Sequence, residues 1–148
     1  MPDDISARER ELLIDCLTDD VSLEWVLIDL GIRVNPPVTP NWRPSSANLD
    51  EAFSILARLV DLGLVAVGRM EYIDEGPAGR VAPVRHVTEP LDVVRARVDD
   101  AVASAAQGSD VDWAYACWVV STPAGDRRTR EFDSLPSGAT PKVGSGRG

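Results

Sequence analysis

The sequence predicts an α+β fold in which a three-helix core leads into a β-hairpin, and a fourth helix and a C-terminal strand follow. Apolar residues recur at helical spacing in four stretches, and residues 64–87 have the pattern of strand, turn and strand. At 148 residues the chain has the size of one domain. We expect this domain to cover residues 1–125. Residues 126–148, which end in Pro, Gly and Ser, should form a flexible, disordered tail.

Sequence signals mark where the first helix begins and where the second helix ends. Ser6 and Glu9 have the spacing of a capping box, which predicts the start of a helix. A second helix over about residues 23–30 should stop at Gly31. Trp25 widens the apolar stripe of this second helix, so we expect more than half of its circumference to be buried.

A proline-rich loop is inserted between the second and third helices. Residues 32–47 contain four prolines, which exclude a continuous helix. The third helix should begin at Asn48, which with Glu51 has the spacing of a second capping box. It should end at Gly63, where a left-handed backbone conformation favours glycine.

The β-hairpin is predicted from two runs of strand-forming residues, 64–73 and 80–87, on either side of a turn cluster. Pro83 has no N–H to donate, so the second strand should lie at a sheet edge. A fourth helix should start near Pro90, and the apolar residues 113–122 should add a buried strand to the hairpin sheet.

The passage "LARLVDLGLVAVG", in which the third helix leads into the first strand, resembles the winged helix-turn-helix superfamily, and so does the order of elements over about residues 6–87. The resemblance implies that the third helix is the recognition helix and that the hairpin is the wing. The positions that carry it are Leu56, Leu59, Gly63, Leu64 and Val65. DNA-binding members have a tight turn between helices two and three, whereas residues 32–47 intervene here.

Charge and hydropathy restrict the possible partners. The net charge is −9, and residues 1–125 carry 10 basic and 21 acidic residues, a balance of −11. Such a field repels DNA and anionic membranes and favours a basic partner. The longest apolar run, residues 113–120, is too short to span a bilayer, and the acidic N-terminus does not resemble a secretory signal. We therefore expect a cytoplasmic protein without a membrane partner.

The outer face of the predicted third helix favours protein binding. It carries Asp50, Glu51 and Asp61 against the single Arg58, and Trp42 in the proline-rich loop is a possible aromatic anchor. We therefore predict a non-enzymatic protein that binds a basic protein partner, as an inhibitor, antitoxin or immunity protein would. The alternative for Trp42 is that it packs the loop onto the core.

DNA binding by a transcriptional regulator is the alternative function, with a homodimer formed through the fourth helix or the last strand. Phosphate contacts would come from the hairpin, the proline-rich loop and the third helix. The residues concerned are Arg58, Arg69, Arg80, Arg85, Arg33 and Arg43. The arginines of the hairpin have an alternative of their own, which is to pair with the surplus carboxylates of the domain.

Sequence motifs for catalysis are lacking, so we expect no enzyme, no cofactor and no metal. His86 is the only histidine and has no accompanying nucleophile motif. Cys16 and Cys117 are isolated thiols that should fill the core. Acidic doublets such as Asp19-Asp20 lack the spacing of a calcium loop, and we interpret them as caps and solvated turns.

Overall fold

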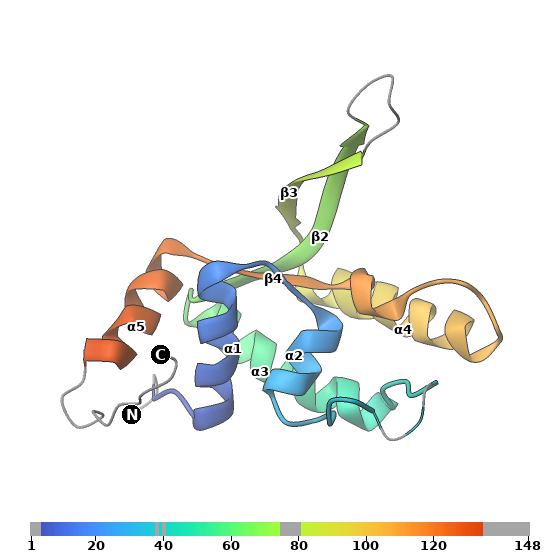
Figure 1. Ribbon diagram of the computed structural model, residues 1–148, viewed down its shortest axis with the longest axis horizontal. Helices are drawn as coiled ribbons and strands as arrows, with labels where there is room; N and C mark the ends of the chain where they lie inside the picture. The colour runs from blue at the N-terminus through green and yellow to red at the C-terminus, as the bar shows by residue number, and fades with distance from the viewer. Residues whose placement is uncertain (1–3, 38, 40, 75–80, 135–148) are drawn as a thin grey trace.

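The computed structural model describes residues 4–37, 39, 41–74 and 81–134 (Figure 1). Within these ranges it contains five α-helices, a short 3-10 helix and a four-stranded antiparallel sheet, so the α+β class is confirmed. The elements are α1 (Ala7–Thr18), β1 (Val21–Ser22), α2 (Leu23–Asp29), α3 (Ser46–Asp61), β2 (Val65–Asp74), β3 (Val81–Thr88), α4 (Leu91–Ala106), η1 (Trp113–Ala116), β4 (Trp118–Ser121) and α5 (Pro123–Ser134).

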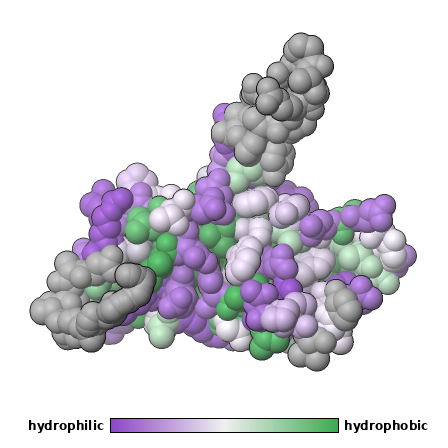
Figure 2. Space-filling model, in the orientation of Figure 1, coloured by the Kyte–Doolittle hydropathy of each residue, from purple (hydrophilic) through white to green (hydrophobic). Residues whose placement is uncertain are grey.

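The core lies between the helices and one face of the sheet. Each fully buried leucine or valine side chain stabilises the fold by about 1.5–3 kcal/mol relative to an exposed one. The largest fully buried side chains are Leu12, Leu13, Leu23, Val26, Leu27, Leu30, Leu56, Leu59, Val67, Val94, Val98 and Val119. On the face shown in Figure 2, hydrophobic residues occur in small separate groups among hydrophilic ones.

Helix α3 begins one turn earlier than the sequence predicts. Its N-cap is Ser45, whose hydroxyl accepts a hydrogen bond from the Asn48 amide at 3.0 Å, while the Asn48 side chain accepts from the Ser45 amide at 2.9 Å. The expected capping box of Asn48 and Glu51 is therefore wrong, because Ser45 takes the cap. The other end is as predicted, since Gly63 has a φ of +75°.

The sheet has the strand order β1-β4-β2-β3, and every neighbouring pair is antiparallel. The predicted hairpin forms, and Pro83 lies on the edge strand β3, as expected. The first part of β2 pairs with β4 and the rest with β3, and Gly68 is the residue that pairs with both. The hairpin then projects away from the body of the domain (Figure 1).

The predicted strand over residues 113–122 is only partly correct. Residues Trp113–Ala116 form the 3-10 helix η1, because the Asp112 carboxylate accepts a hydrogen bond from the Ala114 amide at 3.0 Å and caps it. Only Trp118–Ser121 is a strand. It lies between β2 and the two-residue strand β1, which the sequence did not predict.

The expected flexible tail is corrected for residues 126–134, which belong to helix α5. The Thr122 hydroxyl accepts a hydrogen bond from the Gly125 amide at 2.9 Å, which caps the first turn. Phe132 packs against the core, and α5 lies along α1 (Figure 1). The folded domain therefore extends beyond residue 125. Residues 135–148 of the expected tail lie outside the described residues.

Candidate functional site

The acidic face predicted on α3 is partly neutralised by arginines from other helices. Asp50 lies 3.0 Å from the guanidinium of Arg95 on α4, and Glu51 lies 2.7 Å from that of Arg8 on α1. Asp61, at the C-terminal end of α3, is exposed. Two of the three carboxylates proposed for partner contact therefore already hold arginines of the same chain.

Arg58, the basic residue on the same helix, also lies in an internal contact. Its guanidinium is 2.6 Å from the Glu9 carboxylate and donates to the backbone carbonyl of Asp4. Burial opposes ionisation of Glu9, but hydrogen bonds from the Ser6 amide and from Arg58 outweigh it and hold the Glu9 pKa below its usual value.

Trp42 packs against the body of the domain. Its ring meets that of Trp113 edge to face, with centroids 6.0 Å apart and an interplanar angle of 60°. The guanidinium of Arg33 lies 5.5 Å from the Trp42 ring centroid and pairs with Glu24 at 2.5 Å. These contacts correspond to the packing alternative for Trp42 and to a structural role for Arg33. Arg43 is exposed and donates to the carbonyl of Asn41 at 3.3 Å.

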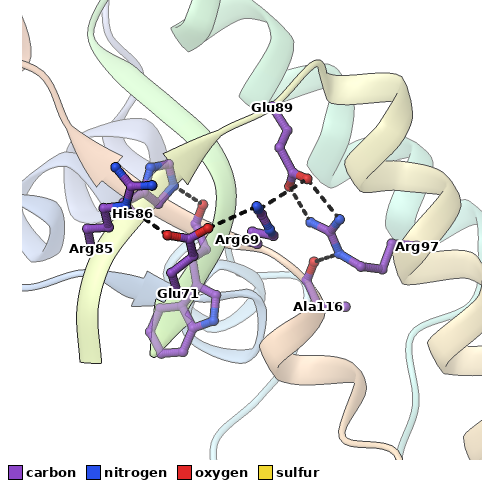
Figure 3. A network of polar contacts seen from close by, with 8 residues as sticks. Arg69, Glu71, Arg85, His86, Glu89, Arg97 and Ala116 are labelled. Carbon is purple, nitrogen blue, oxygen red and sulfur yellow. Dashed lines mark hydrogen bonds and ion pairs between the residues drawn. The ribbon is translucent and has the colours of Figure 1, made fainter. Parts of the chain in front are cut away.

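The arginines of the hairpin are held by carboxylates at its base (Figure 3). Glu71 lies 3.2 Å from Arg69 and 2.8 Å from Arg85. The hydrogen bond from Arg85 is the main cause that lowers the Glu71 pKa. Arg85 is the most exposed of these arginines, with 68% of its side chain accessible, and Arg80 lies outside the described residues.

A second carboxylate joins the hairpin to α4. Glu89 lies 2.6 Å from Arg97 of α4 and 4.0 Å from Arg69, which stands between the two carboxylates (Figure 3). Arg97 also donates to the carbonyl of Ala116 at 2.9 Å. The ring of His86 lies 3.1 Å from the Trp118 carbonyl oxygen, so this histidine has a structural contact. These contacts fix the hairpin to the body of the domain. They also pair the arginines with carboxylates, and so neutralise the positive charges that phosphate binding would need.

A different part of the surface gathers carboxylates together with an exposed aromatic ring. Where α1 ends and α2 begins, a hollow of about 280 Å³ opens between α1, β1 and α2. We call it the acidic hollow, and its lining consists of Asp15, Thr18, Asp19, Asp20, Val21 and Trp25. Trp25 is 48% exposed, which corrects the expectation that it widens a buried stripe.

The carboxylates of the acidic hollow have no arginine partner among the residues that the structure describes. Within the part of the chain that the structure describes, Asp15, Asp19 and Asp20 form no ion pair. They also lie at the C-terminal end of α1, whose last turn contains no basic residue. The C-terminal end of a helix dipole is negative and disfavours further negative charge. The carboxylates at this end therefore lower the stability of the fold and make the electrostatic potential in the hollow more negative.

A partly buried carboxyl group on α2, that of Asp29, lies next to Asp15 of the hollow. Burial raises the pKa of Asp29 to about 8, and the hydrogen bond and negative charge of Asp15, with the charge of Glu11, act in the same direction. The Oδ2 atom of Asp29 is buried and has no hydrogen-bond partner among the described residues. The hollow is thus backed by a pair of carboxyl groups that both helices contribute.

From the sequence, Asp19 and Asp20 are expected only to form caps and solvated turns, and Trp25 is expected to widen the buried stripe of the second helix. The signal that was available is the run of acidic residues at a helix C-terminus, where basic residues are favoured. The other part of the signal is Trp25, which follows this acidic run on the next helix.

Comparison with known proteins gives no match: no family model, no curated protein and no solved structure is significantly similar to the chain. Among the described residues, no group of three or more His, Cys, Asp and Glu could hold a metal ion. None of the described helices has the length and apolar character needed to cross a bilayer. Cys16 and Cys117 are buried thiols, and burial raises the pKa of each to about 12.

Proposed function

We propose that the protein acts without catalysis by binding a basic protein partner, and that the acidic hollow is the contact. One observation carries this proposal. Four of the six arginines expected to contact DNA are paired with carboxylates: Arg33, Arg58, Arg69 and Arg85. By contrast, Asp15, Asp19 and Asp20 form no ion pair within the described part of the chain and lie beside the exposed Trp25.

The chemistry of the hollow suits a lysine or arginine side chain. A cation that enters it would meet three carboxylates and could lie against the indole face of Trp25, an interaction of about 0.5–2 kcal/mol. The net charge of −9 would steer a basic partner toward the protein and raise the association rate. Exposed tryptophans are also common anchors of protein interfaces.

The position of the hollow differs from the site that the sequence suggested. Asp50 and Glu51 are engaged by Arg95 and Arg8, so we place the contact at the junction of α1 and α2 and not on α3. A role as an inhibitor, antitoxin or immunity protein remains part of the proposal, because binding at the hollow would cover a basic surface of the partner.

We also propose that the domain has a winged-helix fold. The order of three helices and a projecting hairpin supports it. The 16 residues from 30 to 45 that join α2 to α3, and the engagement of Arg58 by Glu9, fit a winged helix that binds protein. DNA binding by a dimer is the alternative, and the exposure of Arg85 on the projecting hairpin is the observation that favours it.

The test is a titration of a fluorescein-labelled oligo-arginine peptide, followed by anisotropy at about 0.15 M salt, where charges beyond about 8 Å are screened. The variant Asp19→Asn/Asp20→Asn removes two charges from the hollow, and the matched control Asp50→Asn/Asp61→Asn removes two from α3. We expect the hollow variant to weaken binding about tenfold or more and the control to weaken it less than threefold. Equal losses in both variants would show non-specific charge attraction and overturn the proposal.

A further inference from the structure

We propose that a second hollow of the domain binds a saccharide, with a sugar ring lying on two tryptophans. This hollow measures about 350 Å³ and opens between residues 41–43, which precede α3, and residues 109–113, which lead from α4 into η1. We call it the tryptophan hollow. It shares no lining residue with the acidic hollow, so saccharide binding there does not depend on the proposed function. The lining residues used below are Asn41, Trp42, Arg43, Asp110, Asp112 and Trp113.

The floor of the tryptophan hollow is formed by the lining residues that are half-buried, and these are apolar. They are Trp42, Trp113 and Ala105 of α4. The two indole rings meet edge to face, with their centroids 6.0 Å apart. The face of an aromatic ring carries partial negative charge and attracts the weakly positive C–H groups on the flat side of a sugar ring. The floor therefore offers a surface on which such a ring can stack.

The rim of the tryptophan hollow is exposed and carries opposite charges. Arg43 and Asn41 lie on one segment, and Asp110 and Asp112 lie on the other. Among the described residues these three charged side chains form no ion pair, although they line the same hollow. The rim thus presents hydrogen-bond donors from one segment and acceptors from the other. A sugar hydroxyl group both donates and accepts, so it can bond to each of them.

Both segments of the hollow are held in place by contacts outside it. The guanidinium of Arg33 lies 5.5 Å from the Trp42 ring centroid, and Arg33 does not line the hollow. Only 8% of the Arg33 side chain is exposed, and it is fixed by Glu24 at 2.5 Å. On the other segment, the Ser109 amide donates to the Ser104 carbonyl of α4 at 3.0 Å. A site that is ordered before the ligand arrives loses less entropy on binding.

Two other classes of small ligand fit the tryptophan hollow less well. A free amino acid would depend on ion pairs with exposed side chains, and such pairs contribute little because water and salt screen them. A nucleotide carries phosphate charge, which the net charge of −9 repels, and within the described part of the chain Arg43 is the one arginine at the hollow. An uncharged sugar ring uses both the apolar floor and the polar rim.

The experiment follows the indole N–H signals of the full, isotope-labelled chain by NMR. The probes are the methyl glycosides of glucose, mannose, galactose and N-acetylglucosamine, each titrated separately. We expect at least one of them to shift the signals of Trp42 and Trp113 saturably, with a dissociation constant of about 1 mM, which suits a small ligand at an open site. The Trp25 signal, from the acidic hollow, should stay unchanged.

Two variants on the rim connect the binding to the hollow. Arg43 and Asp110 are exposed, so Arg43→Ala and Asp110→Asn should leave the fold intact. Each should weaken binding of the glycoside by about tenfold, because a hydrogen bond to a charged group is lost. The control Asp100→Asn, on the exposed side of α4 and outside the hollow, should change the affinity by less than about twofold.

Saturable shifts of Trp42 and Trp113 that both rim variants weaken would support the proposal. It is overturned if none of the four glycosides causes a saturable shift up to about 50 mM, far above the constant expected for such a site. Binding that Arg43→Ala and Asp110→Asn leave unchanged would place the sugar elsewhere and overturn it as well. Leucine is titrated in parallel, and shifts caused by leucine but by no glycoside would assign the hollow to a zwitterion instead.

Discussion

The guanidinium of Arg58 on α3 lies 2.6 Å from the carboxylate of Glu9 on α1. Glu9 is only 5% exposed, and its carboxylate also accepts a hydrogen bond from the Ser6 amide at 2.8 Å. The basic side chain that a groove-reading helix would use is therefore part of the contact that joins α3 to the start of α1. Arg58 therefore connects α3 to α1 and is engaged by Glu9 instead of being available to contact DNA.

Replacing Glu9 should destabilise the domain. Glu9→Gln weakens the capping box and leaves Arg58 without its buried carboxylate, so we expect a loss of about 2 kcal/mol in the free energy of unfolding at neutral pH. Because the Glu9 pKa is lowered below 4.5 in the folded state, this contribution is present above that pH and is lost as the pH falls through the folded value. Urea unfolding at several pH values checks this. Glu11→Gln, an exposed change on the same helix, is the control and should cost less than about 0.5 kcal/mol.

Trp42 and Trp25 should behave in opposite ways. Trp42 packs on Trp113 and under Arg33, so Trp42→Ala should lower the free energy of unfolding by about 2–3 kcal/mol. Trp25 is half exposed, and Trp25→Ala should cost less than about 1 kcal/mol but weaken binding of the oligo-arginine peptide. Thermal unfolding of the two variants measures the difference. Similar losses of stability would show that Trp25 is a packing residue as well.

Gly68 should tolerate no side chain. A Cβ there would lie 1.8 Å from the Val87 carbonyl oxygen, so the strands β2 and β3 would have to separate. We expect Gly68→Ala to cost more than about 2 kcal/mol and to increase hydrogen exchange along the hairpin. The comparison is Gly63→Ala, where nothing lies within 4 Å of the added atom and only the φ of +75° is strained, at about 1 kcal/mol. A fully stable Gly68→Ala protein would contradict the described strand pairing.

The two thiols should be unreactive in the folded protein. Burial raises the pKa of Cys16 and of Cys117 to about 12, so the nucleophilic thiolate is scarce at neutral pH. We expect alkylation by iodoacetamide to proceed only as fast as the chain unfolds, and to become rapid in urea. Mass spectrometry follows both sites. Fast labelling of either cysteine without denaturant would mean that its environment opens locally.

Much of the fold could be predicted because local patterns determine it. Periodic leucines identify α1, α2 and α3, and Gly63 and Pro83 identify a helix end and an edge strand. Predictions from local sequence patterns were wrong where two residues could take the same role or where an element is very short. Both Ser45 and Asn48 can cap α3, and the two-residue strand β1 is too short to give a pattern. Helix α5 is largely polar, so its pairing with α1 is not evident from composition.

The candidate site was harder to predict because it depends on pairs that are distant in the sequence. Asp50 with Arg95, and Glu51 with Arg8, are brought together only by helix packing. That packing removes the acidic face that α3 has as an isolated helix. The same packing leaves the carboxylates at the end of α1 without an ion-pair partner among the described residues, so the acidic hollow can be recognised only in the three-dimensional structure.

The most direct measurement is an amide NMR map of the isotope-labelled protein, titrated separately with the oligo-arginine peptide and with a generic DNA duplex. We expect the peptide to shift signals around the hollow, from Asp15 to Trp25, and DNA to cause no saturable shifts even at low salt. Saturable DNA-induced shifts centred on Arg69 and Arg85, with the hollow unaffected by the peptide, would contradict it and would assign the domain to nucleic-acid binding.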